Sequence, residues 1–71
     1  MIIYAPLWAT MNRKGKTKKD LRENLKLSSA TIAKLSSNEP VRIDIIDKLC
    51  EYLNCQPADL IEYAPTEPKL D

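Results

Sequence analysis

Apolar residues recur every three or four positions along most of the chain, the spacing that places them on one face of an α-helix. Ile45, Leu49 and Leu53 form such a stripe in the second half, opposite acidic and basic positions. Leu7 and Met11 have the same spacing near the start of the chain. The pattern predicts five helices, over residues 6–14, 18–24, 29–36, 43–53 and 57–61.

Residues that begin or end helices separate these stretches. Thr17 and Ser28 are suited to cap the second and third helices, because their hydroxyls accept hydrogen bonds from free backbone N–H groups. Pro6 suits the first position of a helix. Gly15, the only glycine, falls where a left-handed residue closes the first helix. Asn38 falls where the third helix needs the same conformation.

Both ends of the helical region are β-prone. Ile2-Ile3-Tyr4 precedes the first helix, and Ile61-Glu62-Tyr63 follows the last one. One interpretation is that the two segments pair as short strands, either within one chain or across a dimer. A two-stranded ribbon of this kind needs further packing to be stable. The other interpretation is that Ile3 and Tyr63 only cover the helical core.

With 71 residues, the chain is expected to form one small domain. We expect the domain to span residues 1–63. Residues 64–71 hold two prolines and no apolar periodicity, so they are interpreted as a flexible tail. The first residues lack the features of a secretory signal, and no stretch approaches the roughly 18 apolar residues of a membrane helix. The sequence therefore predicts a cytoplasmic protein.

No combination of residues in the sequence resembles a catalytic constellation or a metal site. The sequence has no histidine to act as a base, and no phosphate-binding loop. Cys50 and Cys55 have no second pair with which to complete a zinc site, so we expect free thiols in a reducing compartment. Trp8 has the spacing of a core residue rather than of a base-stacking residue. We therefore expect no enzyme, metal, cofactor or small-molecule ligand.

Charge is distributed unevenly along the chain, although the net charge is only +1. Residues 1–38 hold eight basic and two acidic side chains, a net charge of +6. Residues 39–71 hold three basic and eight acidic side chains, a net charge of −5. A lysine-rich stretch is often no more than a solvated surface. Beside a suitable helical motif, however, it gives one face a positive field that favours nucleic acid.

Residues 18–35 form such a motif, which we interpret as two short helices joined by a tight turn. Leu21 and Leu25 anchor the first helix, and Ile32 and Leu35 anchor the second at i,i+3 spacing. The second helix opens on small hydroxyl and methyl side chains, which suit insertion into a DNA major groove. The candidate base-reading residues are Ser29, Ala30, Thr31 and Lys34. For Thr31, the alternative is a hydrogen bond within the helix.

Candidate phosphate contacts surround these two helices. The first N–H groups of the helix over 18–24 point outward with a partial positive charge, which favours an anion. Hydroxyl and amide groups just after the third helix can donate to a neighbouring phosphate. Such contacts set the register and the affinity without reading sequence. The candidates are Lys16, Thr17, Lys18, Lys19, Lys26, Ser36, Ser37 and Asn38.

The order and spacing of these residues resemble the Cro and phage-repressor (XRE-type) helix-turn-helix family, particularly its small stand-alone regulators. The resemblance covers about residues 7–63. It is carried by Leu-x5-Leu-Ser-Ser-x-Thr-Ile-x-Lys-Leu over 21–35, by Asn-Glu-Pro-Val over 38–41, and by Leu-Cys-Glu-x-Leu-Asn-Cys-x-Pro-x-Asp-Leu over 49–60. It implies an all-α fold: a compact five-helix, lambda-repressor-like DNA-binding domain.

Three positions depart from the family pattern. Arg22 replaces a small residue that packs against the next helix, and Lys18 replaces a common glutamine. Lys26 replaces the glycine that usually makes the turn, and a left-handed lysine costs about 1 kcal/mol. These departures affect the turn geometry more than the fold.

The resemblance implies sequence-specific binding of double-stranded DNA and regulation of transcription, most simply repression. Because one such domain covers only a half-site, we expect a homodimer on a pseudo-palindromic operator. The dimer contacts are expected near Tyr52, Leu60 and Tyr63, or along the N-terminal strand. The alternative is a protein-binding module with the same fold, such as an antitoxin or an anti-repressor-like partner.

Overall fold

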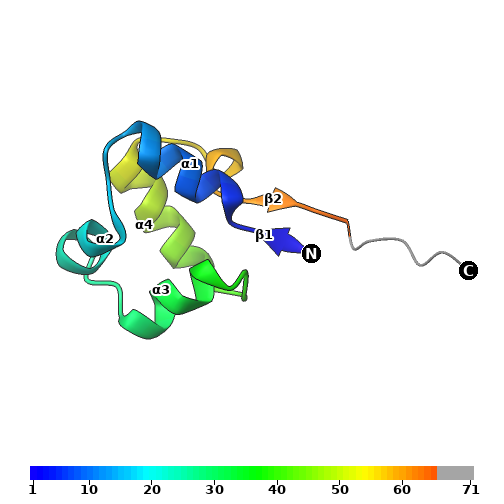
Figure 1. Cartoon of the computed structure of the whole chain (residues 1–71), viewed down its shortest axis with the longest axis horizontal. Coiled ribbons are helices and arrows are strands. Elements are labelled where there is room, and N and C mark those ends of the chain that lie inside the picture. The colour runs from blue at the N-terminus through cyan, green and yellow to red at the C-terminus, as the bar shows by residue number, and fades with distance from the viewer. Residues whose placement is uncertain (66–71) are drawn as a thin grey trace, which may run out of the picture.

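The computed structural model describes residues 1–65, which contain four α-helices, one 3₁₀ turn and two short strands (Figure 1). The elements in chain order are β1 (Ile2–Ile3), α1 (Ala5–Arg13), α2 (Lys18–Asn24), α3 (Ser29–Ser36), α4 (Ile43–Leu53), η1 (Pro57–Asp59) and β2 (Glu62–Tyr63). The predicted all-α class is confirmed. The predicted bounds of α2, α3 and α4 agree with the structure, and α1 lies one residue earlier than expected.

The helix predicted over residues 57–61 is wrong in type and length. Pro57 begins only a single 3₁₀ turn, which ends at Asp59. In this turn the Asp59 N–H donates to the Gln56 carbonyl at 2.8 Å. Leu60 is then fully buried, and the chain extends directly into β2. Leu60 must be buried and β2 begins at Glu62, so the chain leaves the helical conformation after Asp59, before an α-helical turn is complete.

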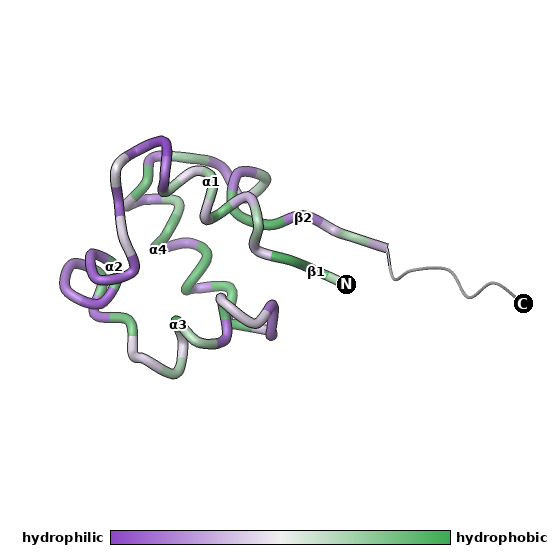
Figure 2. The backbone as a smooth tube through the Cα atoms, in the orientation of Figure 1, coloured by the Kyte–Doolittle hydropathy of each residue, from purple (hydrophilic) through white to green (hydrophobic). Residues whose placement is uncertain are grey.

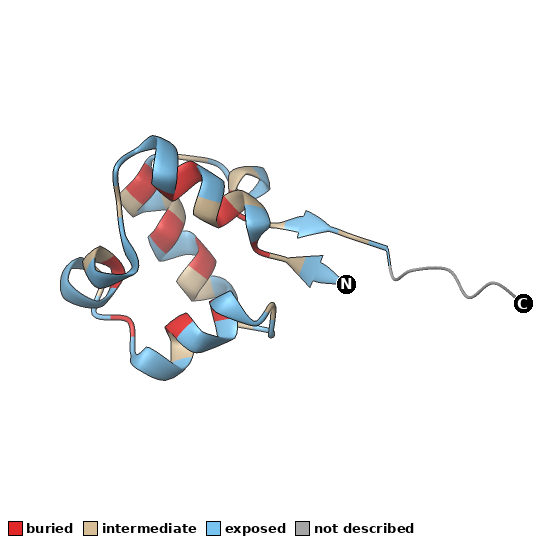
Figure 3. Ribbon diagram, in the orientation of Figure 1, coloured by how far each residue is buried: buried red, intermediate tan, exposed pale blue. Residues whose placement is uncertain are grey.

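The core lies between α1 and α3, with α4 at its centre (Figure 1). Leucines from every α-helix meet there, and Figure 3 shows the buried positions on the faces that the helices turn toward one another. Trp8 packs against this cluster, as its spacing predicts. The buried apolar residues are Tyr4, Leu7, Met11, Leu21, Leu27, Ile32, Leu35, Ile46, Leu49, Leu53 and Leu60.

The helix ends have the predicted capping residues. The Thr17 hydroxyl accepts a hydrogen bond from the Asp20 N–H, and the Asp20 carboxylate accepts one from the Thr17 N–H, which makes a capping box. Ser28 caps α3 through the Thr31 N–H at 3.1 Å. Gly15 and Asn38 both have positive φ, at 70° and 58°, as predicted.

Three hydrogen bonds connect segments that are distant in sequence. The Tyr4 N–H donates to Asn38 Oδ1 at 2.9 Å, and the Tyr4 hydroxyl donates to the Glu39 carbonyl at 2.8 Å. Burial raises the pKa of the Tyr4 phenol above its ordinary value, which keeps the hydroxyl in its neutral, donating form. Thr10, also buried, donates to the Asp59 carbonyl at 2.8 Å. These contacts join the start of the chain to the end of α3 and to η1.

The two β-prone segments pair within one chain, which is one of the alternatives that the sequence left open. β1 and β2 are antiparallel, with Ile2 opposite Tyr63 and Ile3 opposite Glu62. The ribbon projects from the helical body and carries both ends of the described chain (Figure 1). Met1, Ile2 and Tyr63 remain 52%, 43% and 67% exposed. The ribbon is therefore an accessible apolar surface.

The structure also bears on the expectations about membrane helices, metal ligands, the two cysteines and the tail. Between residues 1 and 65, no helix has the length and apolar character needed to cross a membrane. That same part of the chain contains no cluster of three potential metal-ligating side chains. Cys50 and Cys55 are free thiols, and burial raises the pKa of the Cys55 thiol, with a further contribution from Cys50. The predicted tail over 64–71 lies, from residue 66 on, outside the described residues.

The position of Leu49 in the core predicts a large loss of stability in Leu49→Ala. Leu49 is fully buried on α4, so its truncation should lower the free energy of unfolding by about 2–5 kcal/mol. Lys48→Ala, at the exposed neighbouring position, should change it by less than about 0.5 kcal/mol. Urea unfolding followed by circular dichroism measures both. Similar unfolding midpoints for the two variants would show that the core is misplaced.

Candidate nucleic-acid interface

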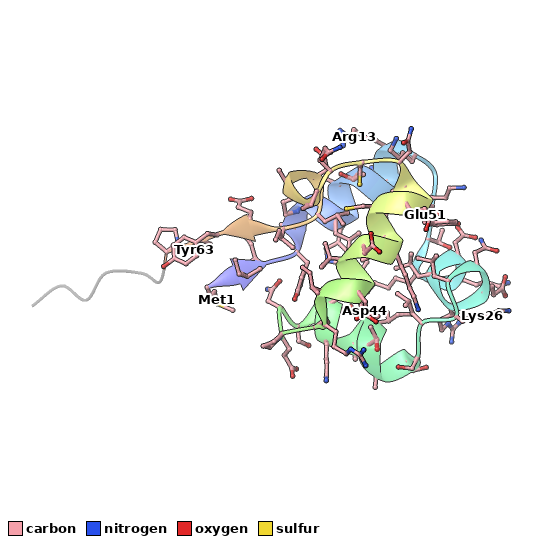
Figure 4. All side chains as sticks on the ribbon, turned by 180° about the vertical axis from the view of Figure 1, so that it is seen from behind. Met1, Arg13, Lys26, Asp44, Glu51 and Tyr63 are labelled. Atoms are coloured by element: carbon pink, nitrogen blue, oxygen red, sulfur yellow. The ribbon has the colours of Figure 1, made fainter. Side chains whose placement is uncertain are left out.

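Residues 25–28 join α2 to α3 in a tight turn that holds without a glycine. The N–H groups of Leu25 and Leu27 donate to the Leu21 carbonyl, at 3.1 and 3.3 Å. Between them, Lys26 adopts a left-handed conformation with φ of 60°. Its side chain is exposed at the outer edge of the turn (Figure 4). The turn therefore keeps the geometry that the motif needs, and it presents a positive charge where glycine would present none.

One face of α3 is buried and the opposite face is open to solvent. Ile32 and Leu35 are buried in the core. Ser29, Ala30 and Lys34, three of the four predicted base-reading residues, are exposed. Because a helix turns by about 100° per residue, burial of one face commits the other side chains to point outward. The structure thus brings these three residues together on one accessible surface.

Thr31, the fourth predicted base-reading residue, is half-buried and joined to the cap of α3. Its Oγ1 accepts a hydrogen bond from the Ser28 hydroxyl at 3.1 Å, and its N–H donates to Ser28 Oγ at the same distance. The alternative foreseen for Thr31 was a hydrogen bond within the helix, whereas the bond present joins its side chain to Ser28, the N-cap of α3. The Thr31 hydroxyl keeps its own proton, which can be donated to a base acceptor.

The predicted phosphate contacts before α3 lie around the start of α2. Lys18 and Lys19 are the first two residues of α2 and are exposed, whereas Lys16 is half-buried. Figure 2 shows that hydrophilic residues dominate this turn and α2. The Thr17 hydroxyl donates to Asp20 Oδ2 at 3.1 Å, so it serves the capping box. The cap engages the Asp20 N–H, and the exposed lysine side chains add positive charge that can attract phosphate here.

Two of the three predicted contacts after α3, Ser36 and Asn38, have structural roles of their own. The Ser36 hydroxyl donates to the Ile32 carbonyl at 3.0 Å within α3. Asn38 Oδ1 accepts the Tyr4 N–H, which leaves the amide nitrogen of Asn38 as the group that could reach a phosphate. Ser37 is exposed at the end of α3.

Two grooves beside α3 contain basic residues that sequence reasoning missed. A groove of about 340 Å³ between α2 and α3 is lined by Arg22 together with Lys18 and Ser29. A second groove of about 310 Å³, between α3 and α4, is lined by Lys34, Arg42 and Lys48, among others.

In the sequence, Arg22 belongs to the basic stretch before α3 and departs from the family pattern, but it was not predicted as a phosphate contact. The Arg22 side chain is exposed, so it is not buried between α2 and α3. The small residue of the family pattern is therefore not required at this position. Arg42 and Lys48 carried no local signal, because only the turn between α3 and α4 brings them beside α3. Arg42 is also within 3.2 Å of Asp44, in an exposed ion pair. Such a pair is weak enough to exchange for a phosphate.

Comparison with known proteins adds independent information on this arrangement. Residues 6–66 match the family model described as the Cro/C1-type HTH DNA-binding domain. The chain is also similar to a crystal structure of the transcriptional regulator VanUg, with 39% sequence identity and a TM-score of 0.85. The match covers 90% of this chain and 85% of the other. A search of curated proteins gave no significant match.

The left-handed backbone of Lys26 predicts that Lys26→Gly will stabilise the domain. Glycine adopts this conformation without steric cost, so the free energy of unfolding should rise by up to about 1 kcal/mol. Lys19→Gly, within α2, should instead lower it by about 1 kcal/mol. Thermal unfolding compares the two variants. A loss of stability in Lys26→Gly would contradict the turn geometry.

Proposed function

Because the chain belongs to the Cro/C1-type helix-turn-helix DNA-binding family, we propose that it is a transcriptional repressor that binds its operator sequence-specifically. α3 enters the major groove, and occupancy of the promoter excludes RNA polymerase. The exposed side of α3 carries the proposal. It presents Ser29, Ala30 and Lys34 to solvent, while Ile32 and Leu35 on the opposite side are buried in the core. The similarity to the transcriptional regulator VanUg supports the regulatory role.

The exposed side chains of α3 offer a defined but permissive set of base contacts. Ser29 can donate to or accept from several bases, and Thr31 can donate to an acceptor such as guanine O6 or thymine O4. The methyl group of Ala30 can contact a thymine methyl. Lys34 favours the guanine acceptors N7 and O6. These properties select a short major-groove pattern without specifying one operator.

Basic side chains on both sides of α3 would hold the domain on the DNA backbone. Lys16, Lys18 and Lys19 lie before it, and Lys26 lies in the turn that leads into it. Arg42 and Lys48 lie in the groove on its other side. Each contact with a phosphate adds affinity that does not depend on sequence and that falls with salt.

A homodimer fits this role, because the domain is small enough to contact one half-site only. Among the dimer contacts expected from the sequence, Leu60 is fully buried within one chain, and Tyr52 is half-buried against the core. The ribbon is more accessible, with Met1, Ile2 and Tyr63 exposed. Two ribbons from different chains could pair at their free edges. We therefore favour the ribbon as the dimer contact.

Binding of random duplex DNA should weaken steeply as salt is raised. The logarithm of the binding constant should fall linearly with the logarithm of the salt concentration, with a slope of about −0.9 per phosphate contacted. Fluorescence anisotropy of a labelled duplex measures this slope. A protein-binding module of the antitoxin or anti-repressor-like type would not bind random duplex DNA at low salt. If the protein does not bind random duplex DNA at low salt, DNA binding is rejected and the protein-binding module is favoured.

Base-reading and phosphate-contacting residues should differ in what their removal changes. Lys34→Ala should alter the preferred sequence, losing about 1–3 kcal/mol on the best site. Lys26→Ala should weaken binding nearly equally on every sequence and reduce the salt slope by about one contact. Selection from a random duplex pool measures the preference of each variant.

The same selection tests the homodimer. An inverted repeat is expected for the wild-type protein, whereas a single half-site would contradict the homodimer.

A further inference from the structure

Lys18 lies against the only tryptophan of the chain. Its ammonium nitrogen is 4.9 Å from the centre of the Trp8 ring, within the range of a cation–π contact. Trp8 belongs to α1 and is half-buried, since it packs against the hydrophobic core. The ring is therefore held by the core, while Lys18 is exposed at the first position of α2.

A second aromatic ring has the same relation to Lys16. The Lys16 ammonium nitrogen is 5.2 Å from the centre of the Tyr52 ring. Tyr52, on α4, packs against the core, and its hydroxyl accepts a hydrogen bond from Asn24 Nδ2 at 2.9 Å. Two different helices, α1 and α4, thus each supply an aromatic ring to one lysine near the start of α2.

The two lysines lie on either side of Thr17, the capping residue of α2. Two lysines within two residues of one another therefore each lie over an aromatic ring. Lys19, the next residue, has a different neighbour. Its ammonium nitrogen is 3.9 Å from Glu23 Oε2, and the side chains of both residues are more than 60% exposed.

The arrangement matters because a free lysine side chain samples many rotamers and loses that freedom when it binds a fixed partner. An aromatic face restricts the side chain beforehand, and it contacts only one side of the ammonium group. An ammonium group has three N–H donors, and those that do not face the ring are available to a phosphate oxygen. A restricted cation therefore binds a phosphate with a smaller loss of conformational entropy.

We propose that Trp8 and Tyr52 are positioning residues, which hold Lys18 and Lys16 in the orientation that contacts the DNA backbone. The proposal rests on the proposed DNA binding and extends it to two residues that touch no DNA themselves. It assigns the aromatic rings of α1 and α4 a role beyond core packing. Lys18 thereby differs from Lys19, its neighbour in sequence. Within residues 1–65, no cation–π contact involves Lys19.

A double-mutant cycle on DNA affinity tests the proposal. Trp8→Leu removes the aromatic face and keeps an apolar side chain, and it should weaken binding about two- to fivefold. In a Lys18→Met background the same change should have no further effect, because no cation remains to be positioned. In a Lys19→Met background it should cost the same two- to fivefold as in the wild type. Tyr52→Leu and Lys16→Met form the equivalent cycle for the second pair.

Two further measurements separate positioning from folding. Trp8→Phe keeps an aromatic face, so it should restore most of the affinity lost in Trp8→Leu, and thermal unfolding identifies any variant that is not folded. In the free protein, Trp8 emission should change in Lys18→Met and stay unchanged in Lys19→Met, since Trp8 is the sole tryptophan.

Equal losses from Trp8→Leu in the Lys18→Met and Lys19→Met backgrounds would overturn the proposal and leave Trp8 a packing residue. Trp8 emission that is unchanged in Lys18→Met would overturn it as well, without any DNA present. Failure of the wild-type protein to bind duplex DNA would instead reject the proposed function. The two failures are therefore distinguishable.

Discussion

The packing of Ile32 and Leu35 into the core is the contact on which the rest of the molecule depends. α3 has only eight residues, too few to be stable as an isolated helix, so its burial holds it in place. Once those two side chains are buried, the helical period sends Ser29, Ala30 and Lys34 outward. The surface proposed to read DNA is therefore a consequence of core packing.

The small size of the domain explains why polar contacts between distant segments matter so much. A chain of this length buries a limited apolar area, and each connection between its ends restricts the whole fold. The Tyr4–Asn38 and Thr10–Asp59 hydrogen bonds make such connections. The first of them also holds the residue that closes α3, so the N-terminus of the chain supports the end of the proposed recognition helix.

Around α3, the same side chains serve both structure and electrostatics. Lys26 takes the strained conformation that the turn requires and also adds a positive charge beside α3. Trp8 and Tyr52 contribute apolar surface to the core and also contact Lys18 and Lys16. In a domain with so few residues, an aromatic ring at the core boundary can be in contact with both the interior and the charged surface.

Much of the local structure was predictable from the sequence because its causes are local. Apolar spacing identified α2, α3 and α4, and the capping residues Thr17 and Ser28 marked two of their starts. The exposure of Ser29, Ala30 and Lys34 followed from the same periodicity. The length of η1 did not, because burial of Leu60 and pairing of β2 decide where that turn ends.

Only the tertiary structure decided which distant residues meet. It paired the β-prone segments within one chain, placed Arg42 and Lys48 beside α3, and brought Lys18 and Lys16 against their aromatic rings. The sequence by itself determined where the four α-helices lie and which residues of α3 share a face, since both follow from spacings of about four residues. The remaining contacts join residues that packing brings together across the chain, and no local pattern encodes such distances.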